Sequence, residues 1–282
     1  MRKSRMAVLG AIVAVVVAGL VPATAAAEPN LRAFRGDVNG DRIADRVTPG
    51  VEPGGPGKTP CVFGIELGKP DGTLGASRDY TFDSPRTSAP YCPDMGVVGD
   101  LRRDGKPDLI TTGFQWSEGG LLTLRLVRDK LKVTGLQPGL PFPNTLRSAD
   151  FNADGYPDVW SSSKQVREIR SYNSTSDGSF VPGPISGCSS DPVPQHVIAD
   201  FDGDGGDDIL MSRRCEFLYW VPEIQFGSGK APVAFAGGFQ AYQVFSIDIE
   251  DDGHPDVGVI SDTPQLRVQY FRNDGAGNFT WG

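Results

Sequence analysis

Histidine and cysteine are scarce in this sequence: 282 residues contain two histidines and four cysteines, and no two cysteines have the CxxC spacing. Because zinc sites are built mainly from these two residue types, a zinc site is not expected. The sequence also lacks a phosphate-binding loop, a dinucleotide fingerprint and a Gly-x-Ser-x-Gly nucleophile elbow. The usual signatures of nucleotide-binding enzymes and α/β-hydrolases are therefore missing.

Long apolar runs are missing too, except at the N-terminus. Residues 2–5 carry three positive charges, residues 6–21 are mainly apolar, and three alanines at 25–27 precede Glu28. This order is typical of a secretory signal peptide with a small-residue cleavage site. We therefore expect residues 1–27 to be removed, the mature chain to be secreted to the extracellular side, and no membrane span to remain. A retained N-terminal anchor is the alternative.

Positive charge is in the minority. The whole chain has a net charge of −8, and removal of the three N-terminal cations would leave about −11. An acidic chain repels nucleic acids and anionic lipids at long range, so neither is an expected partner. Part of the negative charge lies in short clusters, a pattern that favours bound cations. A monomer is expected.

A nine-residue acidic motif occurs five times and organises the chain. The first residues of successive copies are 63, 50, 50 and 48 positions apart. Apolar runs flank the motifs; Val197-Ile198 precede the fourth copy and Ile209-Leu210 follow it. Strand, acidic turn and strand is the natural interpretation of such a unit. The five copies are residues 37–45, 100–108, 150–158, 200–208 and 248–256.

Each repeat has room for two further strands. In the first repeat they are expected near residues 61–67 and 77–82, and in the last near 266–271 and 279–281. Four strands in about 50 residues indicate a propeller blade. The sequence therefore predicts an all-β, five-bladed β-propeller of four-stranded antiparallel blades, formed by residues 28–282 as a single domain. The repeats are expected to start near residues 31, 95, 146, 196 and 244. Neither end carries a polar capping repeat, which favours a closed ring over an open solenoid.

The motif places oxygen-bearing side chains at regular positions. Its pattern is Asp-x-(Asp/Asn)-x-Asp-Gly-x-x-Asp, so carboxylate or amide oxygens stand at positions one, three, five and nine. Several hard, anionic oxygens in one short loop suit calcium, and glycine at position six permits the positive φ that a sharp turn needs. The alternative is that these aspartates only cap turns by accepting backbone N–H groups.

The five motifs at this spacing resemble the VCBS/FG-GAP repeat proteins, which include the N-terminal propellers of integrin α-subunits. The resemblance covers essentially the whole chain after residue 27, and residues 273–279 are similar to the turn that closes a blade in that family. It implies three to five structural calcium ions, each bound in the loop between the first two strands of a blade. Carried over, the ligands would be Asp37, Asn39, Asp41 and Asp45; Asp150, Asn152, Asp154 and Asp158; Asp200, Asp202, Asp204 and Asp208; and Asp248, Glu250, Asp252 and Asp256.

Two loops depart from the motif. The first has Arg42 where glycine is expected. The second has Arg102 at position three, where a cation opposes metal binding and could pair with an aspartate of the loop instead. The corresponding residues of that loop, Asp100, Asp104 and Asp108, are therefore less favoured as metal ligands than those of the other four.

The loops at the opposite end of each blade form a second face, and loops on a rigid scaffold are where binding usually resides. Phe114, Trp116 and Trp160 lie in or near these loops and could stack on a sugar or a peptide side chain; packing between blades is the alternative. The sequence thus favours a binding module for a carbohydrate or an extracellular protein.

The four cysteines also lie at or near this second face. An even number in an exported chain suggests two disulfides, for which three connectivities exist. Our hypothesis is that Cys61 pairs with Cys92 and that Cys188 pairs with Cys215.

A carbohydrate-active enzyme and a purely structural scaffold are the alternatives to a binding module. Some five-bladed propellers are glycosidases that use paired carboxylates near the central channel. Several glutamates lie outside the acidic loops, but they share no position among the repeats, so no catalytic pair stands out. They include Glu66, Glu118, Glu168 and Glu223.

Overall fold

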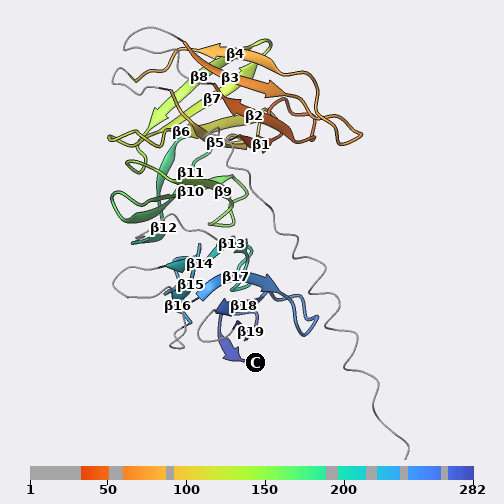
Figure 1. Ribbon diagram of the computed structural model, residues 1–282, viewed down its shortest axis with the longest axis vertical. Coiled ribbons are helices and arrows are strands. Elements are labelled where there is room, and N and C mark those ends of the chain that lie inside the picture. The colour runs from red at the N-terminus through yellow and green to blue at the C-terminus, as the bar shows by residue number, and fades with distance from the viewer. Residues whose placement is uncertain are drawn as a thin grey trace, which may run out of the picture. The chain divides into compact units, whose positions relative to one another are not determined.

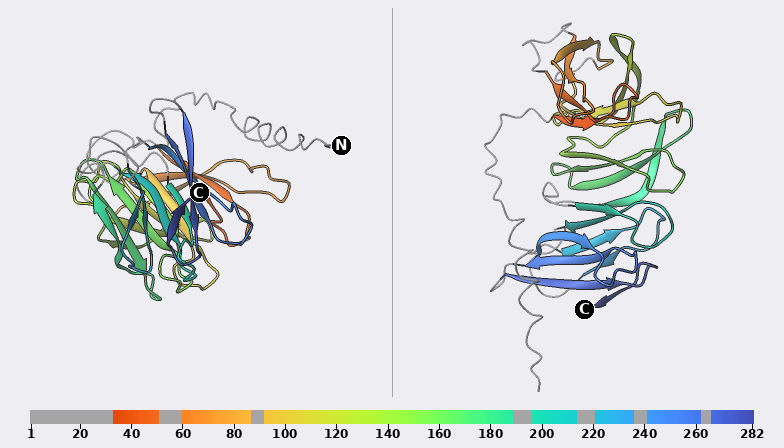
Figure 2. Two further views of the ribbon diagram at one scale, coloured as in Figure 1. Left: turned by 90° about the horizontal axis from the view of Figure 1, so that it is seen from below. Right: turned by 90° about the vertical axis from the view of Figure 1, so that its right-hand side faces the viewer.

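The computed structural model describes residues 33–50, 60–86, 92–188, 196–213, 221–235, 241–261 and 266–282. In these ranges the chain forms twenty β-strands and no helix, so none of them holds a helix that could span a bilayer. The strands form five four-stranded antiparallel sheets, and in each sheet they lie side by side in chain order (Figures 1 and 2). The prediction of an all-β, five-bladed propeller is confirmed. The expected signal peptide lies outside the described residues.

The strands of the five blades have the following bounds. Blade one contains β1 (Phe34–Gly36), β2 (Asp45–Pro49), β3 (Cys61–Glu66) and β4 (Arg78–Phe82). Blade two contains β5 (Met95–Gly99), β6 (Asp108–Thr112), β7 (Leu121–Val127) and β8 (Lys130–Gln137). Blade three contains β9 (Thr145–Ala149), β10 (Asp158–Ser163), β11 (Glu168–Ser174) and β12 (Phe180–Cys188). Blade four contains β13 (His196–Ala199), β14 (Asp208–Arg213), β15 (Val221–Gln225) and β16 (Val233–Ala234). Blade five contains β17 (Ala241–Ile247), β18 (Asp256–Ser261), β19 (Arg267–Asn273) and β20 (Phe279–Trp281).

In blades two and three the second strand is buried on both faces, whereas the outer strand of blade two is half exposed. Every residue of β6 and β10 is buried, and both strands consist of apolar or small side chains after their first aspartate. The outer strand β8 instead has exposed residues at alternate positions along much of its length. This difference follows from a sheet whose middle is covered by neighbouring blades and whose outer edge faces solvent.

Four apolar clusters hold consecutive blades together. Each contains buried side chains from two neighbouring sheets, so the core of the protein is divided among the junctions between blades. In the described part of the chain no comparable cluster joins blade five to blade one, and closure of the ring stays a prediction. The clusters include Phe63 with Leu109, Ile110 with Val159, Trp160 with Ile209, and Leu210 with Val257.

A disulfide joins the first two repeats. Cys61, the first residue of β3, is bonded to Cys92, which lies three residues before β5, and their Cα atoms are 5.5 Å apart. This pairing of blade one with the segment that leads into blade two confirms one of the two predicted disulfides. Cys215 lies outside the described residues, so the second pairing stays a prediction.

Candidate metal centre

All five acidic motifs lie in the loop between the first and second strands of a blade, as predicted. We number each loop one to nine from its first aspartate. The loops share one backbone conformation, because positions four and six have positive φ in every copy. These residues are Gly40 and Arg42, Arg103 and Gly105, Ala153 and Gly155, Gly203 and Gly205, and Asp251 and Gly253.

The aspartates at positions one and five cap the turn in every loop. In loop three, Asp150 Oδ2 accepts the Gly155 N–H at 2.7 Å and Asp154 Oδ1 accepts the Tyr156 N–H at 2.8 Å. The same two bonds are present in the other four loops. A carboxylate has about four lone-pair sites, so turn capping and metal binding are compatible roles for these side chains.

The aspartate at position nine is the first residue of the second strand, and its side chain is buried. In loop four, Asp208 Oδ2 accepts the Phe201 N–H at 2.7 Å, and its Oδ1 accepts the Gly227 N–H at 2.9 Å. One carboxylate therefore fastens the loop to the end of the third strand. Equivalent pairs of bonds are made by Asp45 with Val38 and Gly68, by Asp158 with Phe151 and Ser174, and by Asp256 with Ile249 and Asn273.

Burial makes ionisation of two of these carboxyl groups costly. Burial raises the pKa of Asp158 to about 7, and the charges of Asp154 and Asp150 act in the same direction while two backbone N–H bonds oppose it. Burial likewise raises the pKa of Asp208 to about 7, with Asp202 and Asp204 as the neighbouring charges. A cation bound among such carboxylates would offset both the burial and the repulsion.

Loop four fits a hard cation best. One carboxylate oxygen from each of Asp200, Asp202 and Asp208 lies within 4.8 Å of the others. Asp202 Oδ2 accepts a hydrogen bond from Ser228 Oγ at 2.9 Å, but its Oδ1 is buried without a hydrogen-bond partner. A buried carboxylate oxygen without a donor is costly unless a cation meets it. These three residues could hold calcium, with Asp204 as a fourth acidic side chain in the loop.

Position three is engaged within the protein in loops one, three and five. Asn39 Nδ2 donates to Asp41 Oδ2 at 3.0 Å, and Asn152 Nδ2 donates to Asp154 Oδ2 at 2.9 Å. In loop five, Glu250 forms an ion pair with Arg272 of β19. To ligate an ion, Glu250 would exchange its ion pair for a metal bond, whereas Asp202 of loop four already has an unpartnered oxygen.

Loop two departs furthest from the metal pattern. Asp108 is paired with Arg102 and also with Arg125, and Arg125 reaches Asp104 as well. The sequence pointed to Arg102 but not to Arg125, which lies 17 residues from Asp108 and stands opposite it only in the register of β6 and β7. With two guanidinium groups among its carboxylates, this loop does not fit calcium.

Two of the three aromatic candidates for the ligand-binding face are core residues. Trp116 is 1% exposed and packs in the cluster between blades one and two, with the Arg86 guanidinium 4.4 Å from its ring. Trp160 is fully buried between blades three and four. Their burial agrees with packing between blades, the alternative to stacking on a ligand. Phe114, at 39% exposure in the β6–β7 connection, stays accessible.

The side chain at position six of loop one strains its backbone. Arg42 has φ of 67°, and non-glycine residues pay about 1–2 kcal/mol in this region. We expect Arg42→Gly to raise the free energy of unfolding by about 0.5–1 kcal/mol. The gain is smaller than the strain that is relieved, because glycine also gives the unfolded chain more conformational freedom. Urea denaturation measures this. The control is Gly72→Ala, where φ is 81° and a Cβ would meet no atom within 4 Å; it should lose about 1 kcal/mol. A loss of stability in Arg42→Gly would contradict the assignment of strain.

The raised pKa values of Asp158 and Asp208 make a pH dependence expected for protein freed of divalent ions. Between the usual value of 3.8 and about 7, the folded state holds more protons than the unfolded state at these groups. Stability should therefore fall as pH rises from about 5 to 7.5. Asp177, whose pKa is lowered to about 2 by bonds from Thr175 and Ser179, acts oppositely, but its contribution is lost only as the pH falls below about 5. His196, whose pKa burial lowers to about 4, also acts oppositely below about pH 6.5, so the fall should be steepest between about pH 6.5 and 7.5. Thermal melts across this range measure the slope, and a rise in stability toward pH 7.5 would contradict it.

One comparison with known protein families agrees with the repeated acidic motif. A family model described as an FG-GAP-like repeat matches residues 150–211, from the first aspartate of loop three into β14. No curated protein matches the chain. Two similar solved structures are Bacteroides proteins assigned by inference as 6-phosphogluconolactonases. The one from B. fragilis is 16% identical with a TM-score of 0.49, and the one from B. uniformis is 15% identical with a TM-score of 0.47. In both pairs the match covers 84% of this chain and 66% of the other.

A third similar structure is the V. cholerae biofilm matrix protein Bap1, at 14% identity and a TM-score of 0.46, covering 87% of this chain and 38% of that one. Because each TM-score is below 0.5, these likenesses carry no conclusion about chemistry. The match to an FG-GAP-like repeat and the five four-stranded sheets both agree with a β-propeller built from repeats. The chain is thus a five-bladed β-propeller whose third and fourth blades carry an FG-GAP-like repeat.

Proposed function

We propose that this protein is a secreted, calcium-stabilised β-propeller that binds a carbohydrate or an extracellular protein through the loops opposite its acidic loops. The fold and the FG-GAP-like repeat agree with a binding or interaction module in general. Calcium, secretion and the class of ligand are the specific parts of the proposal, and each has its own support.

Loop four carries the calcium part of the proposal. Its three converging carboxylates include the unpartnered Asp202 Oδ1 and the buried Asp208. The ion would be structural: it would neutralise the cluster and stiffen the connection between β13 and β14. Binding to the folded state alone stabilises a protein by mass action.

The disulfide supports an extracellular location. Bonds such as Cys61–Cys92 form and persist mainly in oxidising compartments. Residues 1–27 have the order of a signal peptide, and the acidic charge of the chain argues against nucleic acid as a partner.

The ligand part rests on the described loops at the second face. Phe114 is 39% exposed there, and Glu118 in the same β6–β7 connection has a side chain that is 73% exposed. An aromatic ring beside polar groups suits a sugar or a peptide side chain.

The hydrolase alternative gains no support from the glutamates. Glu66 pairs with Arg46, Glu118 with Arg86 and Glu168 with Arg170, and Glu223 is buried beside Gln225. They belong to four different blades. If a binding screen finds no ligand, a purely structural scaffold role is favoured.

The calcium site is tested with Asp202→Asn. Wild-type protein should gain about 2.7 kcal/mol for each site at a calcium concentration of 100 times Kd. The variant should lose this gain at loop four. In excess chelator it should be as stable as wild type or more so, because it places one negative charge fewer beside Asp200 and Asp208.

The matched control is Asp71→Asn, since Asp71 caps the β3–β4 turn through Thr73 and belongs to none of the five acidic loops. This variant should keep the full calcium response. Thermal melts and metal content by mass spectrometry give the readout, and wild-type protein with neither bound calcium nor a shift would refute the calcium part.

The ligand face is tested by screening glycan arrays and extracellular proteins with the calcium-loaded chain, followed by Phe114→Ala on any hit. Loss of the exposed ring should weaken binding about tenfold or more, corresponding to the 1.4 kcal/mol or so that a stacking contact contributes. Leu67→Ala is the control, because Leu67 is 37% exposed and lies at the acidic-loop end of blade one. Equal effects of the two variants would place the ligand elsewhere.

A further inference from the structure

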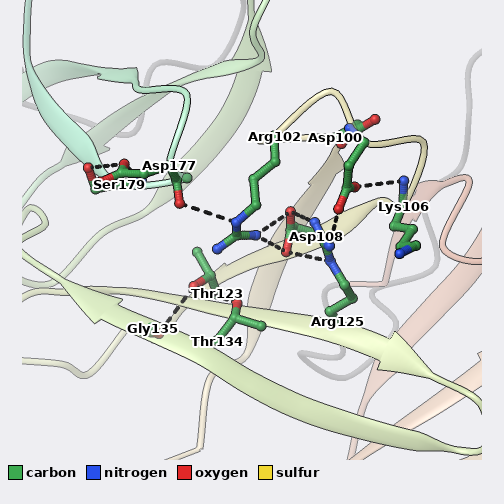
Figure 3. A network of polar contacts seen from close by, with 12 residues as sticks. Asp100, Arg102, Lys106, Asp108, Thr123, Arg125, Thr134, Gly135, Asp177 and Ser179 are labelled. Carbon is green, nitrogen blue, oxygen red and sulfur yellow. Dashed lines mark hydrogen bonds and ion pairs between the residues drawn. The ribbon is translucent and has the colours of Figure 1, made fainter.

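Loop two contains a cluster of charges that the other acidic loops lack. Asp108 is fully buried, and both of its oxygens lie within 3.0 Å of Arg102 Nη1. Arg125 approaches the same carboxylate from β7, with Nε 3.2 Å from Oδ1 and Nη2 2.6 Å from Oδ2 (Figure 3). Two guanidinium groups therefore surround the carboxylate at position nine.

The backbone of loop two differs accordingly. In the other four loops the carboxylate at position nine accepts the N–H of position two. In loop two that residue is Leu101, and its N–H donates to the Gly99 carbonyl oxygen at 3.1 Å. The arginines thus provide what the backbone provides elsewhere, and they add positive charge.

The charges of the loop are nearly balanced within the protein. Arg125 Nη1 donates to Asp104 Oδ2 at 2.7 Å, so its guanidinium bridges positions five and nine. The side chains of Arg102 and Arg125 are 26% and 12% exposed. Arginine does not release its proton in proteins, so a calcium ion here would lie against two fixed positive charges.

The same loop reaches blade three. Arg102 Nε donates to the Asp177 carbonyl oxygen at 3.2 Å, in the turn between β11 and β12. Its neighbour Arg103 donates from Nη1 to the Asp154 carbonyl oxygen at 3.1 Å, and its guanidinium lies 5.0 Å from the Tyr156 ring.

Glycines on blade three make room for both arginines. A Cβ on Gly178 would lie 2.6 Å from Arg102 Cζ, and a Cβ on Gly155 would lie 1.9 Å from Arg103 Nη2. The two side chains are therefore seated against blade three at positions where a larger residue would collide with them.

We propose that loop two binds no calcium because the guanidinium groups of Arg102 and Arg125 occupy the place of the ion, and that Arg102 fastens blade two to blade three whether or not calcium is present. This inference rests on the proposed function only where it contrasts loop two with calcium-binding loops. It limits the five acidic loops to four calcium ions and makes the contact of Arg102 with the β11–β12 turn independent of calcium.

Hydrogen exchange of the backbone amides distinguishes the loops. When calcium is withdrawn with EGTA, amides in loop four should exchange up to about a hundredfold faster if calcium had been present at 100 times Kd. Amides of Asp104, Gly105 and Lys106 in loop two should exchange at an unchanged rate. An increase in loop two that matches the increase in loop four would overturn the proposal.

The double substitution Arg102→Asn with Arg125→Thr tests the replacement directly. Asparagine gives loop two the residue that loops one and three have at position three, and threonine suits a strand. One additional calcium per chain is expected by native mass spectrometry, together with exchange in loop two that now depends on EGTA. An unchanged calcium count would overturn the proposal.

Arg103→Gln is the matched control. It removes a contact with blade three but leaves both partners of Asp108 in place, so the calcium count should not change, while exchange near Asp154 should become faster. A gain of calcium in this variant would refute the assignment of the site to Arg102 and Arg125.

Failure of the proposed function has a different result. If wild-type protein holds no calcium in any loop, the calcium proposal fails. The role of the guanidinium cluster is then tested only by hydrogen exchange in EGTA. There, loop two should exchange faster in the double variant than in wild type, and equal rates would overturn the cluster's role. If the double variant does not fold, the comparison of loops two and four in wild-type protein decides.

Discussion

A buried aspartate at the start of the second strand is the group on which each blade depends. Its carboxylate is removed from water, so both oxygens need donors. In four blades the donors are two backbone N–H groups, one from its own loop and one from the end of the third strand, as with Asp208, Phe201 and Gly227. In blade two the donors are Arg102 and Arg125. The acidic loop is thereby held to the sheet beneath it.

The remaining acidic residues gather negative charge around that buried group. Turn capping requires aspartates at positions one and five, and the backbone with positive φ at positions four and six brings them close together. The resulting repulsion adds to burial in raising the pKa of Asp158 and Asp208. A bound divalent cation and an internal guanidinium are two solutions to the same electrostatic problem, and this chain contains residues suited to both.

The junctions between blades are therefore fastened in different ways. A disulfide ties blade one to the segment before blade two, and arginines tie blade two to blade three. The disulfide and the Arg102 contact with Asp177 involve none of the proposed calcium ligands. Loop four, in contrast, has carboxylates with an unpartnered oxygen, so the part of the chain that contains blade four is where a bound ion would contribute most.

The sequence by itself determined the number of blades, the four strands of each and the position of the acidic loops, because a repeat of about 50 residues with turn residues at fixed offsets leaves few alternatives. The Cys61–Cys92 pair was also correctly predicted. Only the tertiary structure decided which aromatic side chains are accessible, since Trp116 and Trp160 are apolar enough for a binding surface or a core, and the packing of neighbouring blades buried both. It also decided that Asp108 of loop two pairs with Arg125. This contact crosses the pairing of β6 with β7, and no local sequence pattern specifies the register of that pairing.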